Sequence, residues 1–147
     1  PSMTVRRILE TKGREVVTID PATTLAEAVK TLAERRIGVL VVTGSGGDLQ
    51  GILSERDVVR LVAGGGMDAL SGTVGEVMTR EVTTAGEDTT VDEAMEIMTR
   101  RRFRHLPVCE GGRLVGIVSI GDVVKRRIEA AEQEAEEMRS YIHAAAG

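Results

Sequence analysis

The stretch GILSERDVV at residues 51–59 returns as GIVSIGDVV at residues 116–124, with six of nine positions identical. The similarity extends towards the N-terminal side of each copy. Residues 15–43 align without a gap with residues 81–109, and 11 of these 29 positions are identical. A repeat of this kind indicates that one supersecondary unit was duplicated. Because a unit of about 60 residues buries little surface alone, we expect the two copies to pack together as one pair.

Each copy carries signals for the same series of elements. A β-prone run is followed by Thr24 and Glu27, which have the spacing of a helical capping box, and Thr90 and Glu93 repeat this device. Two further β-prone runs, separated by a glycine-rich turn, predict a hairpin. The Ser-x-x-Asp sequence after each hairpin opens another helix. The sequence therefore predicts an α/β fold of two β-α-β-β-α repeats.

The repeats divide the chain into four parts. We expect the first repeat at residues 5–65, a glycine-rich linker at 66–73, the second repeat at 74–128 and a helical extension at 129–147. In the last helix, apolar residues recur at alternating spacings of four and three, which is a heptad pattern. This helix either lies on its own domain or also contacts a second subunit; the sequence leaves both open.

Composition and charge make some classes of function unfavourable for this chain. Of 147 residues, 41% are hydrophobic and 29% charged, which is typical of a globular protein. One Phe, one Tyr and no Trp leave few stacking platforms, and the net charge of −4 makes nucleic acid an unfavourable partner. The sequence contains no apolar stretch of transmembrane length and no signal peptide, so we expect a cytoplasmic protein that does not bind membranes.

The duplicated Gly-hydrophobic-hydrophobic-Ser-x-x-Asp motif, together with RHLPV at residues 104–108, resembles a tandem pair of cystathionine β-synthase (CBS) domains, the Bateman module. The resemblance covers roughly residues 5–128. It implies a pseudo-two-fold pair with two clefts between the copies, which in this family typically hold adenosine-containing ligands. We expect AMP, ATP or NAD first, with ADP and S-adenosylmethionine as alternatives, and no requirement for a metal.

The serine and aspartate of the two motifs are the first candidate ligands. At a helix start, free N–H groups and the helix dipole favour an anion, and a serine hydroxyl can donate to a phosphate. An aspartate can accept from both ribose hydroxyls. The resemblance assigns Asp57 and Asp122 to the ribose and places Ser54 and Ser119 near the phosphate. The alternative is that Ser-x-x-Asp only caps the helix, and the two roles can coexist.

Further candidates come from the resemblance. It places Arg36 and Arg102 just before the inner strand, where a guanidinium reaches phosphates, although cations also suit a helix C-terminus. Arg104 replaces Gly38 of the first copy, so the two clefts should differ. Thr18 and Thr84 lie in the first strand of each copy, where family members contact the nucleotide.

The sequence contains no nucleophile–base pair and no metal cluster, so we expect no catalytic and no metal-binding residues. The expected function is a regulatory module that binds an adenine nucleotide and acts through an unidentified protein partner or through its own oligomer, which we expect to be a homodimer. The alternatives are a structural dimerisation module with empty clefts and a detached regulatory partner of an enzyme.

Overall fold

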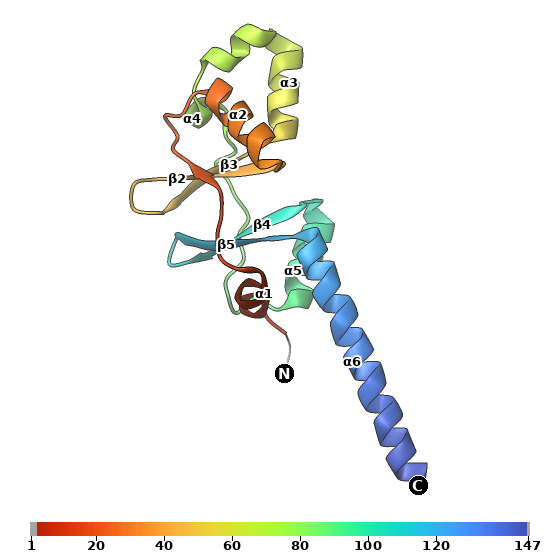
Figure 1. The fold of residues 1–147 in the computed structure, drawn as a ribbon. Coiled ribbons are helices and arrows are strands. Elements are labelled where there is room, and N and C mark those ends of the chain that lie inside the picture. Colours follow the sequence, from red (N-terminus) through yellow and green to blue (C-terminus); the bar gives the residue numbers. More distant parts are fainter. Residues whose placement is uncertain (1–2, 147) are drawn as a thin grey trace.

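The computed structural model describes residues 3–146 and shows two similar halves stacked on each other (Figure 1). The first half contains β1 (Thr18–Ile19), α2 (Leu25–Arg35), β2 (Val39–Thr43), β3 (Leu49–Ser54) and α3 (Glu55–Gly65). The second half contains α5 (Val91–Arg101), β4 (His105–Glu110), β5 (Arg113–Ser119) and α6 (Ile120–Ala146). The helices α1 (Val5–Lys12) and α4 (Val74–Val77) precede the halves, and a 3-10 helix, η1 (Met67–Ser71), lies in the predicted linker. The predicted α/β fold of two repeats with a long C-terminal helix is confirmed, while Gly147, the end of the expected extension, lies outside the described residues.

Capping starts both repeat helices where the sequence predicts. The Thr24 hydroxyl accepts from the N–H of Glu27 at 3.2 Å, and the Thr90 hydroxyl accepts from the N–H of Glu93 at 3.0 Å. In the second copy the box is complete, because the Glu93 carboxylate accepts from the Thr90 N–H at 3.0 Å. These contacts satisfy N–H groups that the first helical turn leaves without partners.

The two sheets differ. In the first, β1 is parallel to β2 and β2 is antiparallel to β3, whereas the second sheet contains only the antiparallel pair β4 and β5. The expected first strand of the second repeat is reduced to a single bridge between Ala85 and Val108. Proline explains the difference: in the first sheet the N–H of Val41 donates to the Val17 carbonyl, and the position equivalent to Val41 is Pro107, which has no N–H.

The two short leading helices are exchanged between the halves. Helix α1 precedes the first repeat in sequence but packs into the core of the second, and α4 packs into the core of the first. The core of the second half consists of Val5, Ile8, Leu9, Ala85, Val91, Ala94, Met98, Leu106, Val108, Val118 and Val123. The core of the first half consists of Leu25, Ala28, Leu32, Leu40, Val42, Leu53, Val58, Val74 and Met78. Each half therefore completes its core with the leading helix that precedes the other half in the chain.

Reciprocal backbone hydrogen bonds show the two-fold relation of the halves. The N–H of Leu49 donates to the Gly112 carbonyl at 3.2 Å, and the equivalent N–H of Leu114 donates to the Gly47 carbonyl at 3.1 Å. The two hairpin turns thus bind each other, and the sheets face one another in the middle of the molecule (Figure 1).

Helix α6 leaves the body after its first turns. Residues 131–146 are exposed, and the helix extends well beyond both halves (Figure 1). Over the described residues 3–146, no helix combines the length and the apolar character that a membrane span requires.

Candidate functional site

A cavity of about 330 Å³ lies between the two halves, a size within the range of small-molecule sites. The first half supplies Ser54 and Asp57, and the second half supplies Arg102 and Arg104. Four of the nine predicted site residues therefore meet in one place. The other lining residues are Gly38, Val39, Ile52, Glu55, Arg56, Thr79, Glu81, Val82, Thr83, Phe103, His105 and Pro107.

Ser54 and Asp57 form a reciprocal capping box at the start of α3. The Ser54 hydroxyl oxygen accepts from the N–H of Asp57 at 3.1 Å, and Asp57 Oδ2 accepts from the N–H of Ser54 at 3.1 Å. The cap uses the serine oxygen only as an acceptor, so its O–H can still donate. It uses one carboxylate oxygen of Asp57 and leaves Oδ1 for another donor. Capping and ligand binding are therefore compatible in the same two residues.

Arg102 adopts a backbone conformation that arginine rarely takes. Its φ of 59° and that of Arg36, 53°, are the two positive values among the described non-glycine residues. Both residues end a repeat helix, where glycine is the usual choice, and a side chain there costs about 1–2 kcal/mol. A strained arginine that lines a cavity suggests a role for its guanidinium, since a glycine would serve the helix end better.

The equivalent place in the second repeat has the same capping box but a different neighbour. Asp122 Oδ2 accepts from the N–H of Ser119 at 2.8 Å, and the Ser119 hydroxyl accepts from the N–H of Asp122 at 3.1 Å. The ammonium group of Lys12 also reaches Asp122 Oδ2, at 2.7 Å. Burial opposes the ionisation of Asp122, but the hydrogen bonds from Lys12 and Ser119 outweigh it, so the pKa of Asp122 lies below its usual value.

The remaining predicted residues do not line the described cavity. Thr18 and Thr84 are exposed, and Arg36, Ser119 and Asp122 are not among the lining residues. In place of Thr84, the preceding residues Val82 and Thr83 face the cavity. Because this segment does not form a strand, the repeat alignment could not predict which of its neighbouring residues faces the cavity.

The sequence analysis did not predict two residues that lie at or near the site, His105 and Lys12. His105 lines the cavity, and its partial burial, followed by repulsion from Lys12, lowers the pKa of its imidazole. Lys12 escapes the repeat comparison because the segment from Val5 to the aligned residue Glu15 is three residues longer than the segment from Val74 to Glu81. That length difference was the available signal.

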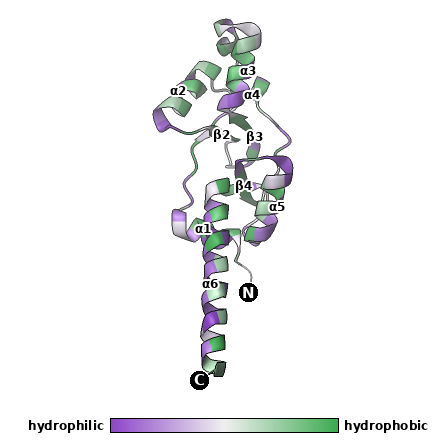
Figure 2. Cartoon of the chain, turned by 90° about the vertical axis from the view of Figure 1, so that its right-hand side faces the viewer, coloured by the Kyte–Doolittle hydropathy of each residue, from purple (hydrophilic) through white to green (hydrophobic). Residues whose placement is uncertain are grey.

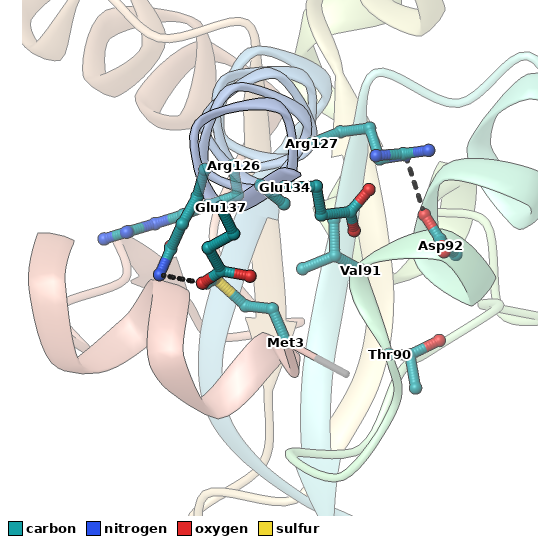
Figure 3. Close-up of a pocket in the computed structure, with 10 residues that line it drawn as sticks. Met3, Thr90, Val91, Asp92, Arg126, Arg127, Glu134 and Glu137 are labelled. Atoms are coloured by element: carbon teal, nitrogen blue, oxygen red, sulfur yellow. Dashed lines mark hydrogen bonds and ion pairs between the residues drawn. The ribbon is translucent and has the colours of Figure 1, made fainter. Parts of the chain in front are cut away.

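A larger groove of about 610 Å³ lies where α6 leaves the body (Figure 3). Its polar side chains are partly paired with one another: Arg127 contacts Asp92 at 3.1 Å, and Gln133 donates to Glu137 at 3.4 Å. Glu134 also faces it, and the groove lacks the Ser-x-x-Asp helix start that the smaller cavity contains. We therefore place the candidate site in the smaller cavity.

Among residues 3–146, no cluster of three His, Cys, Asp or Glu side chains has a geometry suited to a metal ion.

A family model described as "CBS domain" matches residues 2–64 and again residues 74–129. The chain belongs to the CBS-domain proteins. The two matches make it a CBS pair, and the matched residues include both capping boxes and the whole lining of the cavity between the repeats.

Relatives of this CBS pair match it over most of its length. The CBS domain-containing protein CBSX3, mitochondrial, of Arabidopsis thaliana is 34% identical over 96% of this chain and 72% of its own length. The crystal structure of the CBS-domain containing protein ATU1752 from Agrobacterium tumefaciens is 49% identical, with a TM-score of 0.79 over 85% of this chain and 99% of that one.

Two similar structures contain adenosine ligands. The CBS domain pair of protein MJ0100, in complex with 5′-methylthioadenosine and S-adenosyl-L-methionine, is 30% identical, with a TM-score of 0.75 over 89% of this chain and 99% of that one. CBSX2 in complex with AMP is 25% identical, with a TM-score of 0.76 over 86% of this chain and 97% of that one. Homologous CBS pairs therefore bind adenosine compounds.

Proposed function

We propose that this CBS pair is a regulatory module that binds an adenosine-containing nucleotide in the cavity around Asp57. The observation that carries the proposal is the meeting of Ser54 and Asp57 from one repeat with Arg102 and Arg104 from the other. An acceptor for ribose, a helix start and guanidinium donors for phosphate are the chemistry that a nucleotide needs. The adenosine ligands of MJ0100 and CBSX2 support the same class of ligand.

Each group has a defined task in this proposal. Asp57 Oδ1 accepts from the ribose hydroxyls while Oδ2 keeps its bond to the backbone of Ser54. The Ser54 O–H and the first N–H groups of α3 donate to a phosphate. Arg102 and Arg104 neutralise further phosphate charge, which favours AMP, ATP or NAD over an uncharged nucleoside.

Regulation rather than catalysis is the proposed outcome of binding. Because the cavity lies between the repeats, a ligand that contacts both repeats stabilises one relative arrangement of them, and a protein partner can read that arrangement. Two alternatives make different predictions: a structural dimerisation module has no ligand, and a detached regulatory partner of an enzyme requires that enzyme for any effect of the ligand.

A homodimer is the proposed assembly of the chain. The apolar residues that α6 leaves exposed support it, since a self-complementary face is usually covered by two-fold pairing.

Thermal unfolding with AMP, ATP, NAD or S-adenosylmethionine, each at millimolar concentration, tests the function. A ligand at one hundred times its Kd adds about 2.7 kcal/mol, which raises the melting temperature by a few degrees. We expect a rise with at least one adenosine compound and a smaller one with the guanosine equivalent. No rise with any of the four compounds would contradict the proposal and favour the structural module.

A further inference from the structure

Lys12 distinguishes the two clefts of the pair. Its ammonium group donates to the carbonyl of Ile117 at 3.0 Å and to Asp122 at 2.7 Å. Ile117 is the repeat equivalent of Ile52, whose carbonyl accepts from the backbone N–H of Thr79 at 2.9 Å. The ammonium group of Lys12 thus donates to the carbonyl of Ile117 as the N–H of Thr79 donates to that of Ile52. Unlike the N–H of Thr79, it also donates to the aspartate of the motif, Asp122.

The sequence accounts for this difference. Helix α1 has eight residues and α4 has four, and Lys12 is the last residue of the longer helix. The additional turn carries the lysine to Asp122. Among the described residues, no lysine or arginine forms an ion pair with Asp57, the equivalent aspartate.

Partial burial makes the contact between Lys12 and Asp122 hard to replace. The side chains are 34% and 26% exposed, so both charges have lost part of their hydration. Ribose hydroxyls that displaced Lys12 would leave its ammonium group without its acceptors. A neutral donor does not compensate a charged one in such surroundings.

We propose that Lys12 occupies the ribose position of the Asp122 cleft, so that the chain binds one nucleotide, at the Asp57 cleft. This inference rests on the proposed function and specifies which of the two clefts performs it. It also predicts that the second cleft retains the capacity to bind once the ammonium group is removed.

Calorimetric titration with AMP of the wild type and of Lys12→Met tests the inference. Methionine keeps the apolar stem and removes the charge. We expect one site per chain in the wild type and two in Lys12→Met. The double variant Lys12→Met/Asp57→Asn should keep one site of full affinity, at the cleft that contains Asp122, because Asp57→Asn weakens only the other site.

Two results would overturn the inference and leave the proposed function intact: two sites in the wild type, or a single site in Lys12→Met whose affinity Asp57→Asn weakens. Binding by neither protein, with AMP or with ATP, would overturn the proposed function and this inference with it.

A separate observation concerns α6. Six residues form its heptad stripe: Val124, Ile128, Ala131, Ala135, Met138 and Ile142. The larger ones lie open to solvent, with exposed fractions of 53% for Ile128, 59% for Met138 and 58% for Ile142. Figure 2 shows apolar turns alternating with polar ones along the projecting part of the helix. This stripe has no partner within the described chain.

The charges beside the stripe indicate what covers it. Arg127 and Glu134 occupy heptad position g, and Glu132 and Arg139 occupy position e. In a parallel pair of these helices, each g residue faces the following e residue of the other helix, which matches Arg127 with Glu132 of the partner subunit and Glu134 with Arg139 of the partner subunit.

An antiparallel pair would oppose like charges. Glu132 and Glu134 would each face the same residue of the partner, and Lys125 would face the partner's Arg139. In the single chain Arg127 contacts Asp92, but the two side chains are 43% and 76% exposed, so this ion pair is weak and exchangeable.

We infer that a second copy of the chain covers the stripe as a parallel two-stranded coiled coil. Disulfide trapping tests its orientation in a Cys109→Ser background, which removes the native thiol. Under mild oxidation, Met138→Cys should form covalent dimers with itself, because equivalent stripe residues meet in a parallel pair. Ser140→Cys, at the outermost heptad position, is the matched control and should not.

Dimers that form only in a mixture of Ile128→Cys and Met138→Cys chains would overturn the parallel arrangement. A monomeric mass by light scattering at micromolar concentration would overturn the pairing altogether.

Discussion

Gly51 and Gly116 begin the two motifs that define the repeat, and the structure shows why no larger residue fits there. A Cβ at Gly51 would lie 2.6 Å from Met78 Sδ and 2.8 Å from the Thr79 carbonyl oxygen. A Cβ at Gly116 would lie 2.7 Å from Leu9 Cδ2. The glycines therefore allow the exchanged leading segments to reach β3 and β5, since contacts this short force a shift of the neighbour.

We predict that Gly51→Ala lowers the free energy of unfolding by about 1–3 kcal/mol, as overpacking usually does. The Thr79 carbonyl belongs to the backbone and cannot rotate away. Gly64→Ala is the control: nothing lies within 4 Å of a Cβ there, and alanine in α3 should stabilise by about 0.5–1 kcal/mol. Urea unfolding measures both, and equal effects of the two substitutions would contradict the packing argument.

We expect His105 to make the free energy of unfolding depend on pH. Burial, then repulsion from Lys12, lowers the pKa of His105 in the folded state below the unfolded value of about 6.5. The unfolded chain therefore binds the proton first, and the stability present above pH 6.5 is lost as the pH falls towards the folded pKa. We predict a smaller loss between pH 7.5 and 5.5 for His105→Gln than for the wild type in urea unfolding. An identical loss of unfolding free energy in both proteins would show that His105 does not cause the pH dependence.

At the residue scale the sequence predicted part of the set of residues that line the cavity, and their roles towards a ligand stay predictions. The duplicated Ser-x-x-Asp motif identified Ser54 and Asp57, and the cavity includes both. It could not show that Asp122 is bound by Lys12, because that contact joins residues 110 positions apart in the chain. Nor could it place Thr83 in the cavity rather than Thr84.

Among the elements, the hairpins and the repeat helices could be predicted from local sequence signals. Two features could not: the missing strand of the second sheet and the exchange of α1 and α4. The capping residues Thr24 and Thr90 set the starts of α2 and α5. Because Pro107 has no N–H, the first strand expected in the second repeat is reduced to the single bridge at Ala85. The exchange of α1 and α4 was not predictable from the sequence, because both leading segments carry a few apolar residues among charged ones and either core could accept either segment.

The exchange gives a test at the scale of two elements, α1 and β5. Leu9→Ala should lower the free energy of unfolding by about 2–5 kcal/mol, because this leucine is 1% exposed in the core of the second half. Gly116→Ala alone should also destabilise, since its Cβ would collide with Leu9. In the double variant the smaller side chain makes room for the new methyl group.

We therefore expect the two effects to be less than additive, with a coupling of about 0.5–3 kcal/mol measured by a double-mutant cycle in urea. Strict additivity would mean that α1 does not pack on Gly116 and would contradict the exchanged arrangement.

In the whole molecule, the two copies place the equivalent aspartates Asp57 and Asp122 in different surroundings. Asp57 lines a cavity to which the first copy contributes Gly38 and Val39 and the second copy contributes Arg104 and His105, whereas Asp122 is bound by Lys12. The proposed single nucleotide site between the two repeats suits a module whose arrangement responds to one ligand. The extended α6 places a second copy, if bound there, away from the cavity.

The most direct test of the nucleotide site is the affinity for AMP of Asp57→Asn, measured by titration calorimetry beside Asp122→Asn. Asparagine preserves helix capping, so both variants should remain folded. Loss of a charged acceptor should cost about 1.5–3 kcal/mol, which is roughly a 10- to 140-fold weaker Kd for Asp57→Asn. Asp122→Asn, the same change at the aspartate that Lys12 binds, should leave the wild-type Kd unchanged. Wild-type affinity and stoichiometry in Asp57→Asn would contradict the central claim.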